Sequence, residues 1–102
     1  MTYSLTALRG DEALLAKVTE LAGLYFRPSD IAVIVGAEDI DAFVRTVNFD
    51  RGDPVSRAYW LGKLMTEYEL RCKTRQYAVG GSPEAQQAME RYLAQQRQEE
   101  NG

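Results

Sequence analysis

Histidine is absent from this 102-residue sequence, and cysteine occurs once, at Cys72. Without histidine the chain cannot assemble a Ser-His-Asp or Cys-His nucleophilic site, and it lacks the most common zinc ligand. A single cysteine forms no disulfide within the chain. We therefore expect a protein that is not an enzyme and that uses no cofactor and no metal.

Long apolar runs are also missing. No stretch approaches the roughly 18–20 consecutive apolar residues of a membrane span, and the first twelve residues lack the apolar region of a signal peptide. We expect a cytoplasmic protein without a membrane partner. Basic residues are in deficit, 12 against 15 acidic residues, for a net charge of -3. Because phosphate contacts supply much of the affinity for nucleic acid, any DNA contact would have to be local.

The composition is that of a globular protein, with 45% hydrophobic and 26% charged residues. We expect a single domain over residues 1–102. Apolar spacing predicts an all-α fold of five helices. They run from a cap at Asp11 to about Phe26, over 31–35, over 38–49, over 54–79, and from 83 into a tail that frays from Gln95. The apolar run 31–35 would also suit a buried strand, but no second strand-like run is there to pair with it.

Residues 21–49 have the outline of a helix-turn-helix unit. Ile31 and Ala32 lie in a short helix with Ser29 or Asp30 as its cap, and Gly36 supplies the tight turn before a second amphipathic helix. That second helix begins with the acidic residues Glu38, Asp39 and Asp41, which repel phosphate. A helical corner that does not touch DNA is the alternative.

The long helix over 54–79 carries apolar residues in several sectors. One seam with heptad-like spacing is expected to pack on the body of the protein, with Cys72 as a buried thiol: Ala58, Leu61, Met65, Tyr68 and Cys72. The helix from Pro83 is expected to fold back after Gly80-Gly81, so that 54–98 forms an antiparallel hairpin. A chain this short has too little mass to cover every apolar sector of such a helix. We therefore expect a homo-oligomer, with an interface drawn from Tyr59, Trp60, Leu64, Leu70 and Tyr77. The alternative is that the N-terminal helix wraps the long helix and buries these residues within one chain.

The order of these features resembles the small terminase subunits of tailed bacteriophages and prophages. The resemblance covers about Leu21 to Leu93. It rests on the helix-turn-helix outline followed by Asp53-Pro54, Ala58-Tyr59, Gly62-Lys63, Glu67, Ala78 and Gly81-Ser82-Pro83-Glu84-Ala85. It implies a non-catalytic DNA-packaging protein of the bacterial host cytoplasm, which binds double-stranded DNA through the helix-turn-helix and assembles through later helices. It also implies a large terminase subunit as partner.

Three arginines are the candidates for phosphate contact: Arg27 at the entrance of the unit, Arg45 on its second helix and Arg51 after it. Two other functions stay open. The acidic second helix suits a basic protein surface, which favours a helical adaptor that binds protein rather than DNA. A small transcriptional regulator is the third alternative, although that helix offers few groups suited to reading bases.

Overall fold

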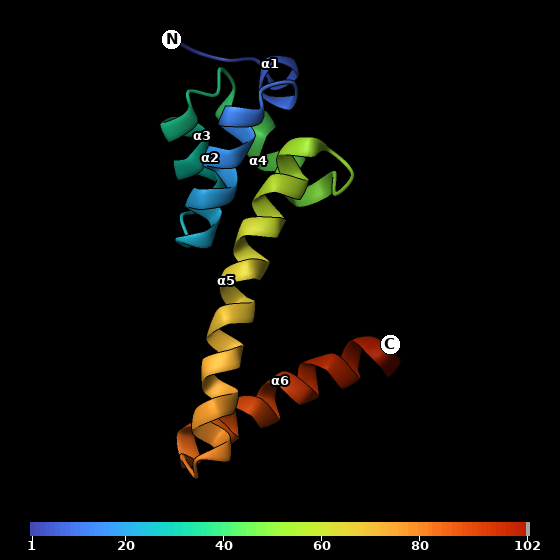
Figure 1. The fold of residues 1–102 in the computed structure, drawn as a ribbon. Helices are drawn as coiled ribbons and strands as arrows, with labels where there is room; N and C mark the ends of the chain where they lie inside the picture. Colours follow the sequence, from blue (N-terminus) through green and yellow to red (C-terminus); the bar gives the residue numbers. More distant parts are fainter. Residues whose placement is uncertain (102) are drawn as a thin grey trace. The chain divides into compact units, whose positions relative to one another are not determined.

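A computed structural model describes residues 1–101, and these residues are helical with no strand. The helices are α1 (Leu5–Arg9), α2 (Glu12–Gly23), α3 (Pro28–Val35), α4 (Ile40–Phe49), α5 (Pro54–Val79) and α6 (Pro83–Asn101) (Figure 1). The all-α class is confirmed, but the described chain has six helices where the sequence predicted five. By its internal contacts the chain divides into an N-terminal unit, Met1–Thr66, and a C-terminal unit that begins at Glu67.

The additional helix, α1, is held by tertiary contacts that leave little trace in the sequence pattern. Ser4 caps it, and Leu8 is buried in the core of the N-terminal unit. The Arg9 side chain donates a 2.6 Å hydrogen bond to Asp53, whose other carboxylate oxygen accepts from the Val55 N–H at the start of α5. A helix of five residues is too short to show a 3.6-residue period, so the sequence gives no reliable signal for it.

The helix starts that have a capping side chain lie at the residues that the sequence predicts, or within two residues of them. Asp11 accepts from the Leu14 N–H, and Ser82 accepts from the Ala85 N–H. The second helix of the corner starts at Ile40, with Asp39 as its cap, rather than at Glu38. The predicted end of α2 near Phe26 and the polar fray from Gln95 are wrong, because α2 ends at Gly23 and α6 continues to Asn101.

The core of the N-terminal unit gathers apolar side chains from α1 to α4 and from the first two turns of α5. Phe43, Ile31 and Val55 are fully buried in it. Ser56 and Trp60 reach back from α5 to the end of α4, where the Ser56 hydroxyl and the Trp60 indole N–H both donate to the Val47 carbonyl oxygen at 3.1 Å. Two side chains therefore satisfy one carbonyl of the last turn of α4 and fix the corner between these helices.

Helix α5 meets α2 along a different face from the predicted seam. A Cβ added to Gly62 would overlap the backbone of Thr19, so the two helices lie in backbone contact there. The Thr19 hydroxyl donates to the Ala58 carbonyl oxygen at 3.0 Å, and the Thr66 hydroxyl donates to the Gly23 carbonyl oxygen at 2.7 Å. These contacts set the rotation of α5 about its axis.

Most of the predicted packing seam is wrong as a consequence of this rotation, and of its five residues Ala58 packs against the core. The buried residues of α5 are Val55, Ser56, Tyr59 and Gly62. By contrast, Leu61, Met65 and Tyr68 are 57%, 51% and 64% exposed, and the Cys72 thiol is exposed rather than buried. Apolar spacing locates stripes on a helix but does not say which stripe meets a neighbour. In α5 the stripe with the smallest residue packs, because its backbone can approach most closely.

In the C-terminal unit, α6 follows α5 after a turn in which Gly81 has a φ of 99°. The Gln86 side chain donates to the Ala78 carbonyl oxygen at 3.1 Å, and the Arg71 guanidinium lies 4.1 Å from the centre of the Tyr92 ring. Ala85 is the buried residue of α6, and Tyr77 and Leu70 stay exposed on α5. The predicted fold-back thus has contacts near the turn, but α6 leaves these side chains of α5 uncovered.

We expect Gly62→Ala to lower the free energy of unfolding by about 1–3 kcal/mol, the usual range for forcing a methyl group into a packed interior. On an open helix face the same change stabilises by about 1 kcal/mol. Denaturant unfolding followed by circular dichroism measures the difference. Gly80→Ala is the matched control, since an added Cβ there meets nothing closer than 3.5 Å. Equal stability of both variants would contradict the close contact.

Burial raises the pKa of the Tyr59 phenol above its ordinary value. A group whose pKa is raised on folding contributes stability below its unfolded pKa of about 10, and this contribution is lost as the pH rises through the folded pKa. We expect alkaline destabilisation of the wild type that Tyr59→Phe reduces and that Tyr77→Phe, at a 68% exposed position, does not. Unfolding curves between pH 9 and 12 measure this; equal pH dependence of the two variants would contradict it.

Candidate nucleic-acid interface

Helices α3 and α4 pack against each other around a short turn. Gly36 adopts the left-handed conformation, with a φ of 79°, and Ile31 and Ala32 are both fully buried. The amino-terminal segment crosses this turn, because the Tyr3 N–H donates to the Gly36 carbonyl oxygen at 2.7 Å and the Glu38 N–H donates to the Tyr3 carbonyl oxygen at 2.8 Å. The corner has the tight turn at Gly36 that the sequence predicts, and the N-terminal segment braces it.

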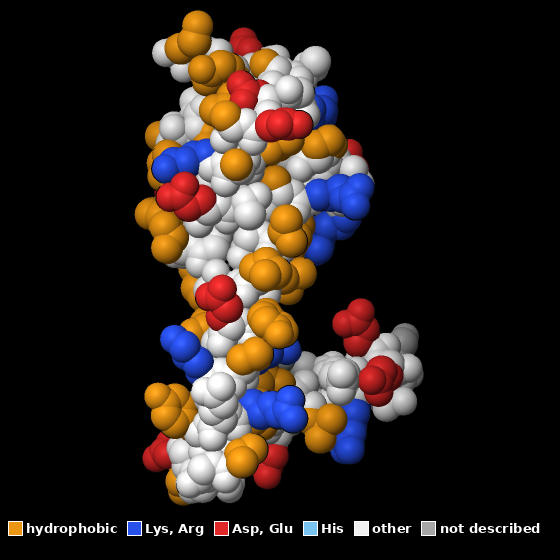
Figure 2. Space-filling model, viewed as in Figure 1, with side chains coloured by type: hydrophobic (Ala, Val, Ile, Leu, Met, Phe, Trp, Pro, Cys, Tyr) orange, Lys and Arg blue, Asp and Glu red, His pale blue; other side chains and the backbone are white. Residues whose placement is uncertain are grey.

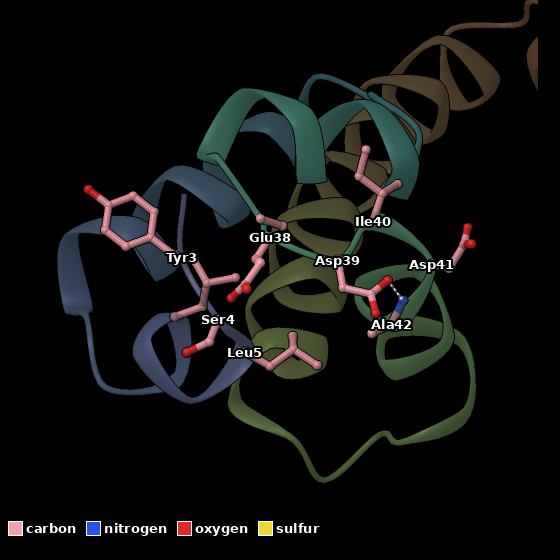
Figure 3. Close-up of a pocket in the computed structure, with 10 residues that line it drawn as sticks. Tyr3, Ser4, Leu5, Glu38, Asp39, Ile40, Asp41 and Ala42 are labelled. Atoms are coloured by element: carbon pink, nitrogen blue, oxygen red, sulfur yellow. Dashed lines mark hydrogen bonds between the residues drawn. The ribbon is translucent and has the colours of Figure 1, made fainter. Parts of the chain in front are cut away.

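The start of α4 is acidic and lines a groove with α1 (Figure 3). Asp39 is occupied as the helix cap and accepts from the Ala42 N–H at 3.0 Å. In Figure 3 the Glu38 side chain lies on the side of Ser4 and Leu5, and Asp41 points away from them. Carboxylates at this end of α4 stabilise the helix through its dipole, and they would repel a phosphate backbone.

Arg27, the first candidate for phosphate contact, is engaged within the chain. Its guanidinium donates to both carboxylate oxygens of Asp30, at 2.9 and 3.1 Å. This pair raises the pKa of Arg27 and lowers the pKa of Asp30, in both cases mainly through the side-chain hydrogen bond. Asp30 therefore pairs with Arg27 and does not cap α3. This helix begins at Pro28, and Arg27 occupies its N-cap position without a side-chain cap hydrogen bond. The prediction that Ser29 or Asp30 caps this helix is wrong.

Arg45 lies on α4, away from the buried side chains Phe43 and Val47. Its side chain is exposed and makes no ion pair or hydrogen bond with any residue in 1–101. Its charge is available to a partner outside the chain.

Arg51 lies in the turn between α4 and α5 and stacks on Trp60. The guanidinium carbon is 3.7 Å from the centre of the indole, and the Lys63 ammonium is 5.0 Å from the same centre. Within residues 1–101 neither cation has an acidic side chain within 4.0 Å. Figure 2 shows basic side chains gathered over this turn and the start of α5. We call Arg51, Trp60 and Lys63 the cation–indole cluster.

The residues expected at an oligomer interface fall into two groups. Tyr59 is only 8% exposed and belongs to the core, and Trp60 is half-buried with its N–H bonded to Val47, so the prediction of Tyr59 as an interface residue is wrong. Leu64, Leu70 and Tyr77 are exposed on α5 at 58%, 45% and 68%.

Lys63 is the residue that the sequence reasoning missed. It lies on the opposite side of α5 from the predicted seam. Its spacing of three residues from Trp60 places the two side chains side by side on a helix and was the available signal. The approach of Arg51 to the same ring depends on the α4–α5 turn and has no local signal.

No family model, no curated protein and no solved structure matches this chain. None of the helices within residues 1–101 combines the length and the apolar character needed to cross a membrane.

Proposed function

We propose that this chain is a non-catalytic DNA-packaging protein of the kind represented by the small terminase subunits of bacteriophages and prophages. It self-associates through α5, presents the N-terminal unit to double-stranded DNA and acts with a separate large terminase subunit in the bacterial cytoplasm. The support is the order of sequence features from Leu21 to Leu93, together with the exposed surface of α5.

The observation that carries the proposal is the uncovered apolar surface of a 26-residue helix. At least six large apolar residues of this helix are exposed, and all six except Leu70 are more than half exposed: Leu61, Leu64, Met65, Tyr68, Leu70 and Tyr77. Monomeric proteins rarely leave so many large apolar side chains open on one element, and such surfaces mark contacts between chains. Tyrosine and leucine at these positions offer a partner the area that a stable interface needs.

The DNA half of the proposal rests on unpaired cations in the N-terminal unit. Arg45 and Arg51 have no acidic partner within the described chain, whereas Arg27 is neutralised by Asp30. Arginines of this kind contact phosphate groups and do not distinguish one base from another. The N-terminal unit would therefore bind DNA with a strong salt dependence and little sequence preference.

A helical adaptor that binds protein is the second candidate function, and the acidic groove between α1 and α4 favours it. Carboxylates at the start of α4 fit a basic peptide or protein surface better than a phosphate backbone. DNA is negatively charged and a basic protein surface is positively charged, so a DNA-binding experiment separates the two functions.

Self-association is tested with Leu64→Glu/Leu70→Glu, which places two charges on the open surface of α5. We expect the wild type to have a mass in solution that is a multiple of 11.5 kDa, and the variant to shift toward the monomer with its helical content retained. Size-exclusion chromatography with light scattering measures the mass. Phe49→Glu, on α4 at an 84% exposed position, is the matched control and should assemble as the wild type does. A wild type that remains monomeric at tens of micromolar would refute the assembly half.

DNA binding is tested by the anisotropy of a labelled duplex at several salt concentrations. We expect the logarithm of the wild-type affinity to fall linearly with the logarithm of salt concentration, and Arg45→Gln to reduce the slope by about 0.9, the effect of one lost phosphate contact. Arg27→Gln is the control and should change the slope little, because Arg27 is already paired. A wild type that shows no salt-dependent binding would refute the DNA half and favour the adaptor.

A further inference from the structure

We propose that the cation–indole cluster, Arg51, Trp60 and Lys63, is a binding site for a phosphate group, which under the proposed function belongs to the backbone of double-stranded DNA. The sequence reasoning assigned Arg51 to DNA and Trp60 to an oligomer interface. The structure brings them together and adds Lys63, so Trp60 acts as a platform for two cations.

The platform itself is rigid. The Trp60 indole N–H donates to the Val47 carbonyl oxygen at 3.1 Å, and the ring makes a T-shaped contact with the buried Tyr59 ring at a centroid distance of 5.3 Å and an interplanar angle of 84°. A side chain held at both its polar atom and its ring has little rotational freedom left. The two cations are therefore presented from a fixed surface, which lowers the entropy lost when a ligand binds.

Stacking orients Arg51 without using up its donors. A guanidinium lying over an indole keeps its N–H groups in its own plane, and none of them is bonded to a residue in 1–101. A phosphate can approach that plane from the edge and accept two parallel hydrogen bonds. The attraction between the cation and the ring positions the arginine, but it leaves the charge unneutralised.

Lys63 supplies the second charge. Its ammonium lies 5.0 Å from the same ring, and it has no ion pair even though carboxylates are more numerous than basic residues in this chain. Arg57, three residues before Trp60 on α5, is also exposed and unpaired. Cations gathered without a carboxylate repel one another, and an anion that bridges them removes this repulsion.

The ring geometry also selects what part of a nucleic acid is bound. Arg51 lies over a face of Trp60, so that face is not open to a stacking base. We therefore expect the cluster to contact phosphate through its two cations, with the same affinity for duplexes of different sequence.

Trp60 is the only tryptophan of the chain, so its fluorescence reports on this site without a label. The experiment titrates the full 102-residue protein with a duplex oligonucleotide and, separately, with pyrophosphate, a free source of the same chemical group. We expect both ligands to change the Trp60 emission. We also expect Arg51→Gln and Lys63→Gln each to weaken duplex binding several-fold and to reduce its salt slope by about 0.9.

Lys17→Gln is the matched control. Lys17 is a cation of the same unit that is paired with Glu20 at 3.4 Å, so its loss should leave both the emission change and the slope as in the wild type. Circular dichroism checks that all three variants retain their helices. An equal loss of slope in Lys17→Gln would mean that only net charge matters, and this result would overturn the site.

The inference and the proposed function fail in different ways. If the duplex binds the Arg51→Gln/Lys63→Gln double variant with the wild-type salt slope, the phosphate site is wrong while DNA binding stands. If pyrophosphate changes the Trp60 emission in a manner that depends on Arg51 and Lys63 while no duplex binds, the phosphate site stands and the DNA function is wrong. If neither ligand has an effect on the wild type, both are wrong.

Discussion

The backbone contact between α5 and α2 at Gly62 is the constraint on which the rest of the N-terminal unit depends. With no side chain at this position, α5 approaches the Thr19 backbone directly, and the threonine hydroxyls of Thr19 and Thr66 donate to carbonyl oxygens across the same contact. This approach fixes the rotation of α5. Tyr59 is thereby turned into the core, and Trp60 is turned toward the end of α4 and the turn that carries Arg51.

The same rotation decides which surfaces stay open. A helix that packs through its smallest residues leaves its larger apolar side chains outward, and in α5 these include Leu61, Met65 and Tyr68. The open apolar surface and the cation–indole cluster are thus two consequences of one packing contact. Leu61, Met65 and Tyr68 lie on the side of the helix away from Lys63, whereas Leu64 follows Trp60 by four residues and borders the cluster.

The sequence predicts those features whose cause is local. Asp11 and Ser82 mark helix starts because their side chains bond to N–H groups three residues on, and Gly36 marks a turn because of its left-handed backbone. The rotation of α5 could not be predicted, since heptad-like spacing favoured the apolar seam and the close approach at Gly62 requires a neighbour. For the same reason, Arg51 and Trp60 appeared to have separate roles. Their contact depends on how the α4–α5 turn closes.

We propose that this chain both self-associates and binds double-stranded DNA. Native mass spectrometry of the protein mixed with a duplex oligonucleotide, at low and at moderate ionic strength, tests it directly. We expect complexes that contain several copies of the 11.5 kDa chain on one duplex, and we expect the duplex to dissociate before the assembly as salt rises, because phosphate contacts are screened and apolar contacts are not. A spectrum of single chains with no bound duplex at either ionic strength would contradict the account.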